Sequence, residues 1–261
     1  NHLSDESWMD ELRMFTVALT QSEIQQIITD DGGSVGPGTE FEEIFYMPFD
    51  EDYVEVVSGE GAIVEGTPGF AGEAKDGTDA YAGAADSYLT FPADGLMNPE
   101  FSATFWVTVN DTPDRAGILV ISPPDPDNPD TPNKRTSGLR FFREKRGENQ
   151  IYKLNVGVGD GEVWVDGGDD AVLVPSTGNW EHVAFTVAAD SARIYLNGSM
   201  VASNEVTGID WTDCDVMSIM SGAPRFTGWS HFSDESWMDE LRIFDRALTE
   251  EEIDEIISSD N

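Results

Sequence analysis

Closely spaced carboxylates are the residues of this chain that are best suited to chemistry. Asp76 and Asp79 fall in the loop-like run KDGTD. Asp125, Asp127 and Asp130 fall in the Pro-rich run DPDNPDTPN. Ca²⁺ binds six to eight oxygen ligands, which loops of this composition supply. Both runs are candidate calcium-binding loops, although the second lacks the glycine of an EF-hand loop and can equally be solvated surface.

Tryptophans form the second group of candidates, because sugar-binding sites combine aromatic platforms with amide and carboxylate groups. Trp164, Trp211 and Trp229 fall in loops or at the ends of predicted strands. Trp229, in the run PRFTGWSHFS, is the favoured ligand-binding candidate, and Trp211 is the second. The sequence therefore offers loop aromatics on which a sugar could bind.

The remaining reactive residue types carry less information. Cys214 is the single cysteine and lies between two aspartates, which raise the pKa of a thiol. We therefore expect it to be a small buried residue rather than a nucleophile. His2 and His231 are too isolated to form a metal site. Asn110 and Asn197 begin glycosylation sequons, which matter if the chain is exported.

The net charge restricts the partners of the chain. It has 51 Asp+Glu and 14 Lys+Arg, a formal charge of −37 at pH 7. Such a chain has no basic surface with which to bind nucleic acid or an anionic membrane. With 39% hydrophobic residues it can still build a core. Because salt screens self-repulsion, the acidity favours a high-salt environment, with an ordinary acidic secreted protein as the alternative.

The elements that must position these residues are mostly strands. Short apolar runs alternate with Gly, Pro and Asp turn signals, and Asn197-Gly198 is a strong hairpin signal. A helix follows at the C-terminus. The pattern predicts an all-β fold, a two-sheet jelly-roll sandwich with a short C-terminal helix. Strands are expected at 101–109, 117–121, 137–143, 151–158, 162–165, 180–187, 192–196, 199–203, 216–220 and 237–244.

The two ends of the chain repeat each other. Residues 2–32 and 231–261 share 20 identities at an offset of 229 residues. Each copy has the pattern of a strand followed by a helix that begins with a capping box, Thr249 with Glu252 in one and Thr20 with Glu23 in the other. The apolar helix positions agree, so both copies are predicted to form the same strand and helix.

A sandwich has one place for a closing strand and helix, but this chain carries two candidates. We therefore divide it into residues 1–32, the closing strand and helix of a preceding or exchanged repeat, residues 33–40, a Gly-rich linker, and residues 41–261, the main domain. In a tandem array the first copy closes the preceding domain. In a self-assembling polymer it closes a neighbouring chain by strand exchange. The array is the favoured interpretation.

Four motifs occur in order along the main domain. They are DSYLTF at 86–91, FSATFWVTV at 101–109, GNWEHVAFTV with ARIYLNG within 178–198, and SWMDELRIFDRALTEEEI at 236–253. Together they resemble the laminin-G-like jelly-roll domains of the concanavalin A-like lectin/glucanase group. The resemblance implies a jelly-roll fold, with Trp106 and Trp180 in the core and His182 in a structural role.

The resemblance also implies a metal site. Laminin-G-like domains often hold one Ca²⁺ through loop oxygens beside the closing strand. The expected cofactor is therefore a structural calcium ion. Its candidate ligands are Asp76, Asp79, Asp86, Asp239 and Glu240.

Enzymatic activity is not predicted. Glucanases of the wider group carry carboxylates at alternate strand positions, which places them on one face, where they act as a pair. Asp239 and Glu240 are adjacent, so on a regular strand they point to opposite faces, and Glu235 is four residues from Asp239. The spacing does not fit, and these carboxylates are expected to be structural.

These features together predict a repeating extracellular or cell-surface module that acts in adhesion or glycan binding. Its expected partners are a glycan or neighbouring copies of itself. The alternative is a structural subunit of an extracellular filament or surface layer, assembled through exchange of the duplicated closing segment.

Overall fold

The computed structural model describes residues 41–147, 149–166, 172–173 and 179–260. All of them belong to the unit formed by residues 41–261. The closing segment predicted at 1–32 and the linker predicted at 33–40 lie outside the described residues. No helix in the described part is both long enough and apolar enough to span a membrane.

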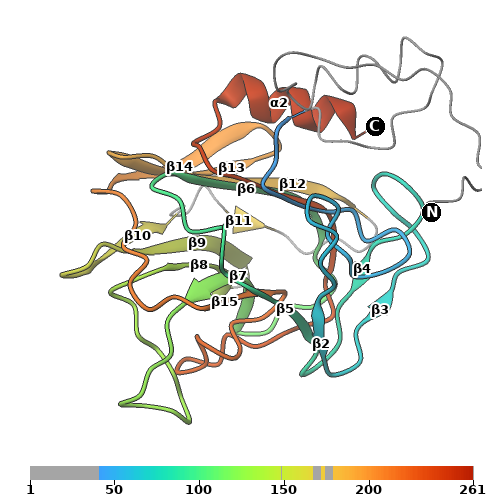
Figure 1. Cartoon of the computed structure of the whole chain (residues 1–261). Helices are drawn as coiled ribbons and strands as arrows, with labels where there is room; N and C mark the ends of the chain where they lie inside the picture. Colours follow the sequence, from blue (N-terminus) through green and yellow to red (C-terminus); the bar gives the residue numbers. More distant parts are fainter. Residues whose placement is uncertain (1–40, 148, 167–171, 174–178, 261) are drawn as a thin grey trace, which may run out of the picture. The chain divides into compact units, whose positions relative to one another are not determined.

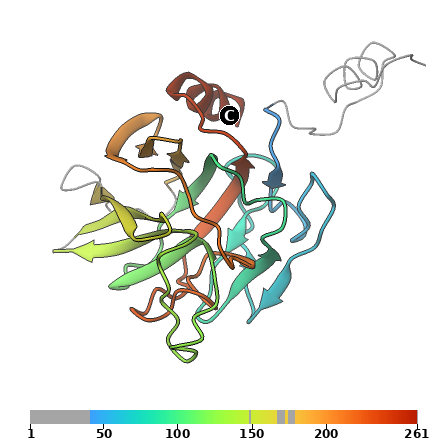
Figure 2. The same cartoon turned by 60° about the vertical axis from the view of Figure 1, so that its left-hand side comes forward.

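Two antiparallel sheets, each with eight strands among the described residues, form separate layers (Figures 1 and 2). In the first sheet β1 (Phe45–Met47) pairs with β16, and the order of the others is β14 (Ser199–Glu205), β13 (Ser191–Leu196), β12 (Glu181–Val187), β6 (Phe101–Thr108), β16 (Trp237–Phe244), β4 (Tyr81–Ala82) and β3 (Gly69–Phe70). In the second sheet β11 (Val172–Leu173) pairs with β9, and the order of the others is β10 (Glu162–Asp166), β9 (Asn149–Gly157), β8 (Leu139–Arg146), β7 (Arg115–Ser122), β15 (Val216–Ile219), β5 (Tyr88–Pro92) and β2 (Ile63–Glu65).

Aromatic side chains join the two sheets across the core. Phe141 of β8 stacks on Phe185 of β12, with ring centroids 4.7 Å apart, and meets Phe105 of β6 edge-on at 6.0 Å. All three are fully buried, and burial of such a side chain stabilises a fold by roughly 1.5–3 kcal/mol. The arrangement confirms the predicted all-β, two-sheet jelly-roll sandwich.

The ten predicted strands are all present, with ends shifted by at most three residues. The predicted hairpin is also present, with Asn197 and Gly198 at φ 48° and 81° between β13 and β14. Strand β5 was not among these ten, although it overlaps the DSYLTF motif. The shorter strands β1 to β4 and β11 were not predicted either. Each has only two or three residues, too few to show alternation, and each is defined by its pairing with another strand.

The C-terminal helix α2 (Glu250–Ser259) covers the outer face of the first sheet (Figure 1). Its capping box is formed as predicted. Thr249 Oγ1 accepts the Glu252 backbone N–H at 3.2 Å, and the Thr249 backbone N–H donates to Glu252 Oε2 at 2.8 Å. Such a cap stabilises a helix by about 1 kcal/mol. The apolar face of the helix packs on the sheet through a cluster of Ala184, Tyr195, Phe244, Leu248, Ile253 and Ile256.

Residues 221–232 form a loop that lies directly on β7. The Gly117 backbone N–H donates to Phe232 O at 3.0 Å, and Gly222 N–H donates to His231 O at 2.7 Å within the loop. At Gly117 the two backbones approach so closely that an added Cβ would lie 2.0 Å from Gly222 N. The loop therefore depends on a glycine at position 117.

We predict that Gly117→Ala lowers the free energy of unfolding by about 1–3 kcal/mol, because backbone must move to admit the methyl group. Gly161→Ala is the matched control, since a Cβ added at Gly161 would have nothing within 4 Å. Urea unfolding followed by tryptophan fluorescence measures both. Equal stability of the two variants would show that the loop does not need this close approach.

Candidate functional site

Three carboxylates meet where β16 lies beside the loop at residues 75–79. One oxygen each of Asp76, Glu240 and Asp260 lies within 4.8 Å of the others. Asp76 is exposed, whereas Glu240 and Asp260 are buried. We call these three residues the acidic cluster. It joins a loop, the closing strand and the residue that follows α2.

A bulge in β16 gives the acidic cluster its geometry. The pairing of β16 with β6 shifts between Asp239 and Arg242, and Glu240 has φ 52°, in the left-handed region. Met238 and Leu241 both lie in the core cluster, so Asp239 and Glu240 both face outward. The expectation that adjacent Asp239 and Glu240 point to opposite faces is therefore wrong, because it assumes a regular strand.

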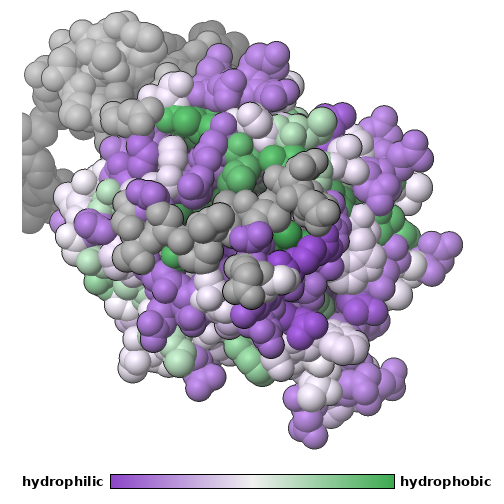
Figure 3. Space-filling model, turned by 180° about the vertical axis from the view of Figure 1, so that it is seen from behind, coloured by the Kyte–Doolittle hydropathy of each residue, from purple (hydrophilic) through white to green (hydrophobic). Residues whose placement is uncertain are grey.

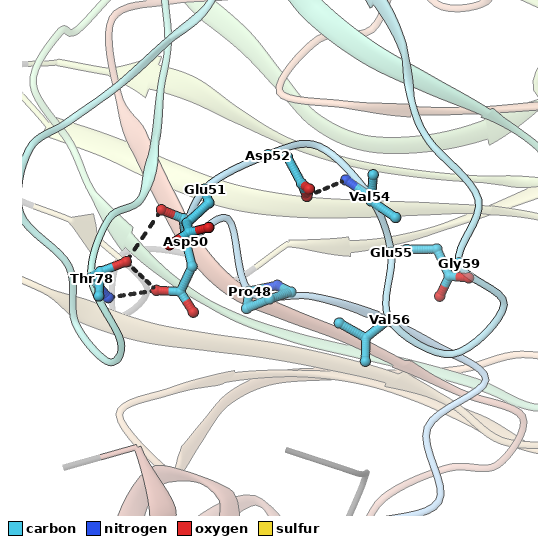
Figure 4. Close-up of a pocket in the computed structure, with 9 residues that line it drawn as sticks. All are labelled: Pro48, Asp50, Glu51, Asp52, Val54, Glu55, Val56, Gly59 and Thr78. Atoms are coloured by element: carbon cyan, nitrogen blue, oxygen red, sulfur yellow. Dashed lines mark hydrogen bonds between the residues drawn. The ribbon is translucent and has the colours of Figure 1, made fainter. Parts of the chain in front are cut away.

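Asp239 holds the loop that carries Asp76. Its carboxylate accepts backbone N–H groups from Lys75 at 2.8 Å, Asp76 at 3.2 Å and Glu240 at 3.0 Å. On the other side of this loop, Asp50 accepts hydrogen bonds from the backbone and the hydroxyl of Thr78 (Figure 4). Asp50 and Thr78 also line a surface cavity of about 470 Å³. The loop is thus fixed from two sides.

Arg242 lies at the centre of the buried charges. Its guanidinium contacts Glu240 at 2.5 Å, Asp260 at 2.8 Å and Glu43 at 3.3 Å. Trp106 Nε1–H also donates to Asp260 at 2.9 Å, and Lys75 Nζ donates to the Asp260 backbone oxygen at 2.8 Å. Carboxylates outnumber the cationic groups here, five to two: Glu43, Asp76, Asp239, Glu240 and Asp260 against Lys75 and Arg242.

Burial, with a smaller contribution from the neighbouring carboxylates, raises the pKa values of two of these carboxyl groups. Burial raises the pKa of Asp239 to about 8, against the hydrogen bonds from Lys75 and Asp76, which lower it. Burial raises the pKa of Glu240 to about 7, although Arg242 lowers it. An additional cation would favour both ionised forms. The donors of the acidic cluster are all carboxylate oxygens, which suit a hard divalent cation such as Ca²⁺.

The predicted metal ligands are only partly brought together. Asp76, Asp239 and Glu240 lie at one site, but Asp79 instead accepts the backbone N–H groups of Gly72 and Ala80. Asp86 is exposed in the turn before β5. Asp260 was missed, because only the fold brings the end of α2 next to Arg242.

The second predicted calcium loop does not converge on one point. Asp125 is buried, and its carboxylate accepts the backbone N–H groups of Asn128 at 3.2 Å and Asn133 at 3.0 Å. Asp127 and Asp130 are exposed. Asp125 therefore stabilises the conformation of its own loop.

Trp229 is exposed in the 221–232 loop, with 54% of its surface accessible. The loop beneath it is well anchored. Phe226 is fully buried and stacks on His231, with centroids 4.3 Å apart, and the backbone N–H of Thr227 donates to Pro132 O at 2.9 Å. The Trp229 ring is therefore accessible to a ligand and is carried on a loop whose position is fixed.

A polar cavity lies beside Trp229. The Arg115 guanidinium stands 6.0 Å from the Trp229 ring centroid, and its Nε bonds to Glu144 Oε1 at 3.0 Å. The cavity has a volume of about 350 Å³ and is lined by Asp114, Arg115, Glu144, Lys145 and Gly147. Trp229 therefore stands next to the charged and polar groups that sugar binding requires.

The other tryptophans are more tightly packed. Trp211 packs against the core, and its Nε1–H donates to Asn98 O at 2.7 Å, so the ligand-binding role predicted for it gains no support. Trp106 is buried as expected, but it lies outside the core cluster, against Asp260 and Lys75. Trp180 is only half-buried and is also outside that cluster. Trp164 is half-buried on the second sheet, packed on Phe142 and Phe226.

The remaining candidates have structural surroundings. His182 is buried edge-on against Trp106 at 5.1 Å, and burial lowers its pKa to about 3. Burial raises the pKa of Cys214 to about 11, which agrees with a buried, unreactive thiol. Both sequon asparagines donate a side-chain hydrogen bond. Asn110 Nδ2 donates to Glu235 O, and Asn197 Nδ2 donates to the Glu181 carboxylate.

Comparisons with known proteins agree with this fold. Residues 82–254 match the family model of the concanavalin A-like lectin/glucanases superfamily, of laminin G type. Domain 4 of AbnA, a GH43 extracellular arabinanase from Geobacillus stearothermophilus, solved with arabinotriose, is similar with TM-score 0.61 and 21% identity, over 82% of this chain and 97% of that one. No curated protein matches the sequence.

Receptor-binding domains of botulinum neurotoxins are also similar. The C/D mosaic domain has TM-score 0.56 and 16% identity over 83% of this chain, and the DC binding domain, solved with SialylT, has TM-score 0.56 and 14% identity over 84%. This chain spans about half, 51%, of each of those chains. At these identities the likeness shows the fold alone.

We predict that Arg242→Met lowers the free energy of unfolding by about 3–5 kcal/mol at pH 7, because it leaves buried carboxylates without their guanidinium. Arg246→Met is the matched control, since Arg246 makes a partly exposed ion pair with Glu252 whose loss costs about 0–1 kcal/mol. Urea unfolding measures both. Similar losses in the two variants would contradict a central role for Arg242.

Proposed function

The chain belongs to the concanavalin A-like lectin/glucanase superfamily, and we propose that it is a non-catalytic, glycan-binding module of an extracellular surface protein. The single observation that carries this proposal is Trp229, exposed on an anchored loop beside a charged cavity. A tryptophan face stacks on the apolar face of a sugar ring, while neighbouring polar groups fix the orientation of its hydroxyls. The AbnA domain solved with arabinotriose shares this fold and adds support.

A non-catalytic role is supported by the position of the carboxylates. Asp239 and Glu240 are both buried, and their oxygens are occupied by backbone N–H groups, Tyr46 and Arg242. A glycosidase needs two carboxyl groups that reach opposite sides of one bound sugar. Instead, Asp239 accepts backbone N–H groups of the 75–79 loop, and Glu240 forms an ion pair with Arg242.

We further propose that the acidic cluster binds one structural Ca²⁺ through Asp76, Glu240 and Asp260. The closely spaced carboxylate oxygens and the excess of carboxylates over cationic groups around Arg242 support this proposal. A bound ion would tie the loop, the closing strand and the end of α2 together. It would supply charge to the fold and take no part in chemistry.

The alternative function, a subunit of an extracellular filament or surface layer, is favoured by the duplicated closing segment. A high-salt extracellular setting suits either function. Hydrophilic side chains cover most of the coloured surface in Figure 3, and the charge of −37 requires screening.

Glycan-array binding in molar NaCl with Ca²⁺ tests the main proposal. We predict that the chain binds a subset of glycans and that Trp229→Ala weakens binding at least about tenfold, a loss of about 1.4 kcal/mol. Phe70→Ala is the matched control, because Phe70 is also an exposed aromatic but lies on β3. Absence of binding, together with salt-dependent fibres, would favour the filament. Release of sugars would contradict a non-catalytic role.

Thermal unfolding in Ca²⁺ and in chelator tests the ion. We predict that Ca²⁺ at about a hundred times its dissociation constant raises the midpoint by roughly 5 °C or more, and that Asp76→Asn abolishes most of this shift. Asp79→Asn is the control, since Asp79 lies outside the acidic cluster and should leave the shift unchanged. Equal responses of the two variants would place the ion elsewhere, or nowhere.

A further inference from the structure

The structure shows which positions of the duplicated segment matter. Residues 231–260 fill what we call the closing site, the place of β16 between β6 and β4 together with the sheet surface under α2. They differ from residues 2–31 at ten positions. Eight of these ten are exposed in the structure, Arg246 is intermediate, and only Ile243, replaced by Met14, is buried. Every other buried position of the closing segment is identical in the first copy.

The identical positions include the buried polar contacts. Asp234 and Ser236 bind the Arg143 guanidinium, and Arg143 and Asp234 are both almost fully buried. Asp239 accepts the Lys75 backbone N–H, and Arg242 binds Glu240, Asp260 and Glu43. Trp106 also donates to Asp260. The matching residues of the first copy are Asp5, Ser7, Asp10, Glu11, Arg13 and Asp31.

Such contacts demand specific partners. A buried charge without its partner costs several kcal/mol, so a segment with these residues fits only where an arginine and carboxylates receive them. The body of this domain offers those partners in Arg143, Glu43 and the Lys75 loop. The closing site therefore offers the first copy the same buried polar partners as the second, and the single buried difference is Met14 in place of Ile243.

The chain connection permits this occupancy. Position 31 corresponds to Asp260, and nine residues, 32–40, separate it from Phe41. Phe41 packs against the cluster under α2, and one guanidinium, that of Arg242, contacts both Asp260 and Glu43. Ten peptide steps span up to about 33 Å, far more than is needed to pass from the end of the closing segment to residue 41.

We propose that residues 2–31 are a second closing segment, which competes with residues 231–260 for the closing site of the same chain. When the first copy occupies the site, the chain is closed as a natural circular permutant. Its displaced C-terminal copy is then available to close another sandwich of this type. The inference does not depend on sugar or calcium binding.

Full-length variants test the proposal. Leu241 is buried in β16, and its equivalent in the first copy is Leu12. We expect Leu241→Asp to keep a cooperative unfolding transition and a monomeric mass, because the first copy closes the domain. Leu12→Asp alone should behave as the unchanged chain, and the double variant should lose the transition. A Leu241→Asp chain as unfolded as the double variant would overturn the proposal, and so would rescue seen only in oligomers.

A disulfide trap identifies the occupant directly. Ile243 pairs with Ala103 of β6, and Met14 is its equivalent. In a Leu241→Asp chain with Cys214→Ala, the pair Met14→Cys and Ala103→Cys should give an intrachain disulfide under oxidation, detected by peptide mass spectrometry. The pair Ile243→Cys and Ala103→Cys, with Leu241 intact, is the positive control. A folded Leu241→Asp chain without the 14–103 crosslink would also overturn the proposal.

Discussion

The contacts of one buried guanidinium hold the ends of this domain together. Arg242 joins Glu43 near the start of the domain, Glu240 in the closing strand and Asp260 after the last helix. An arginine and its carboxylates are costly to desolvate, and they are tolerated only when each has well-placed partners. This domain provides such partners in three ways: the bulge at Glu240, the loop held by Asp239 and the hydrogen bond from Trp106 to Asp260.

These charges serve the stability of the fold and lie apart from the proposed sugar-binding surface. Carboxylates outnumber cationic groups around Arg242, which is the basis of the Ca²⁺ site proposed beside the first sheet. The proposed sugar platform lies on a different loop, packed on β7 of the second sheet through Gly117 and carrying Trp229 above a stacked Phe226 and His231. The ion site would fix the fold, while Trp229 and Arg115 would meet the ligand. A change at one site therefore need not disturb the other.

Local patterns predicted most of the sandwich. Alternation located strands such as β6 and β12, the Asn197-Gly198 pair located a hairpin, and Thr249 with Glu252 located the start of α2, because each signal lies within a few residues. The site was less predictable. Asp260 reaches Glu240 and Arg242 only through the fold, and the bulge turns Glu240 outward. Asp79 instead accepts a hydrogen bond from the Gly72 backbone N–H. Trp229 could be chosen from its loop, but the anchors that hold this loop are long-range contacts.

Native-state hydrogen exchange of the β16 amides shows whether the closing segment and its buried charges hold the fold together. The Leu12→Asp chain is the one to use, because its first copy cannot replace β16. We expect the amides between Met238 and Ile243 to exchange only through global unfolding, with the same opening free energy as those of β6. The short edge strand β2, exposed along its length, should exchange far sooner. Opening of β16 at a free energy well below that of β6 would contradict this dependence, since the segment could then leave an intact sandwich.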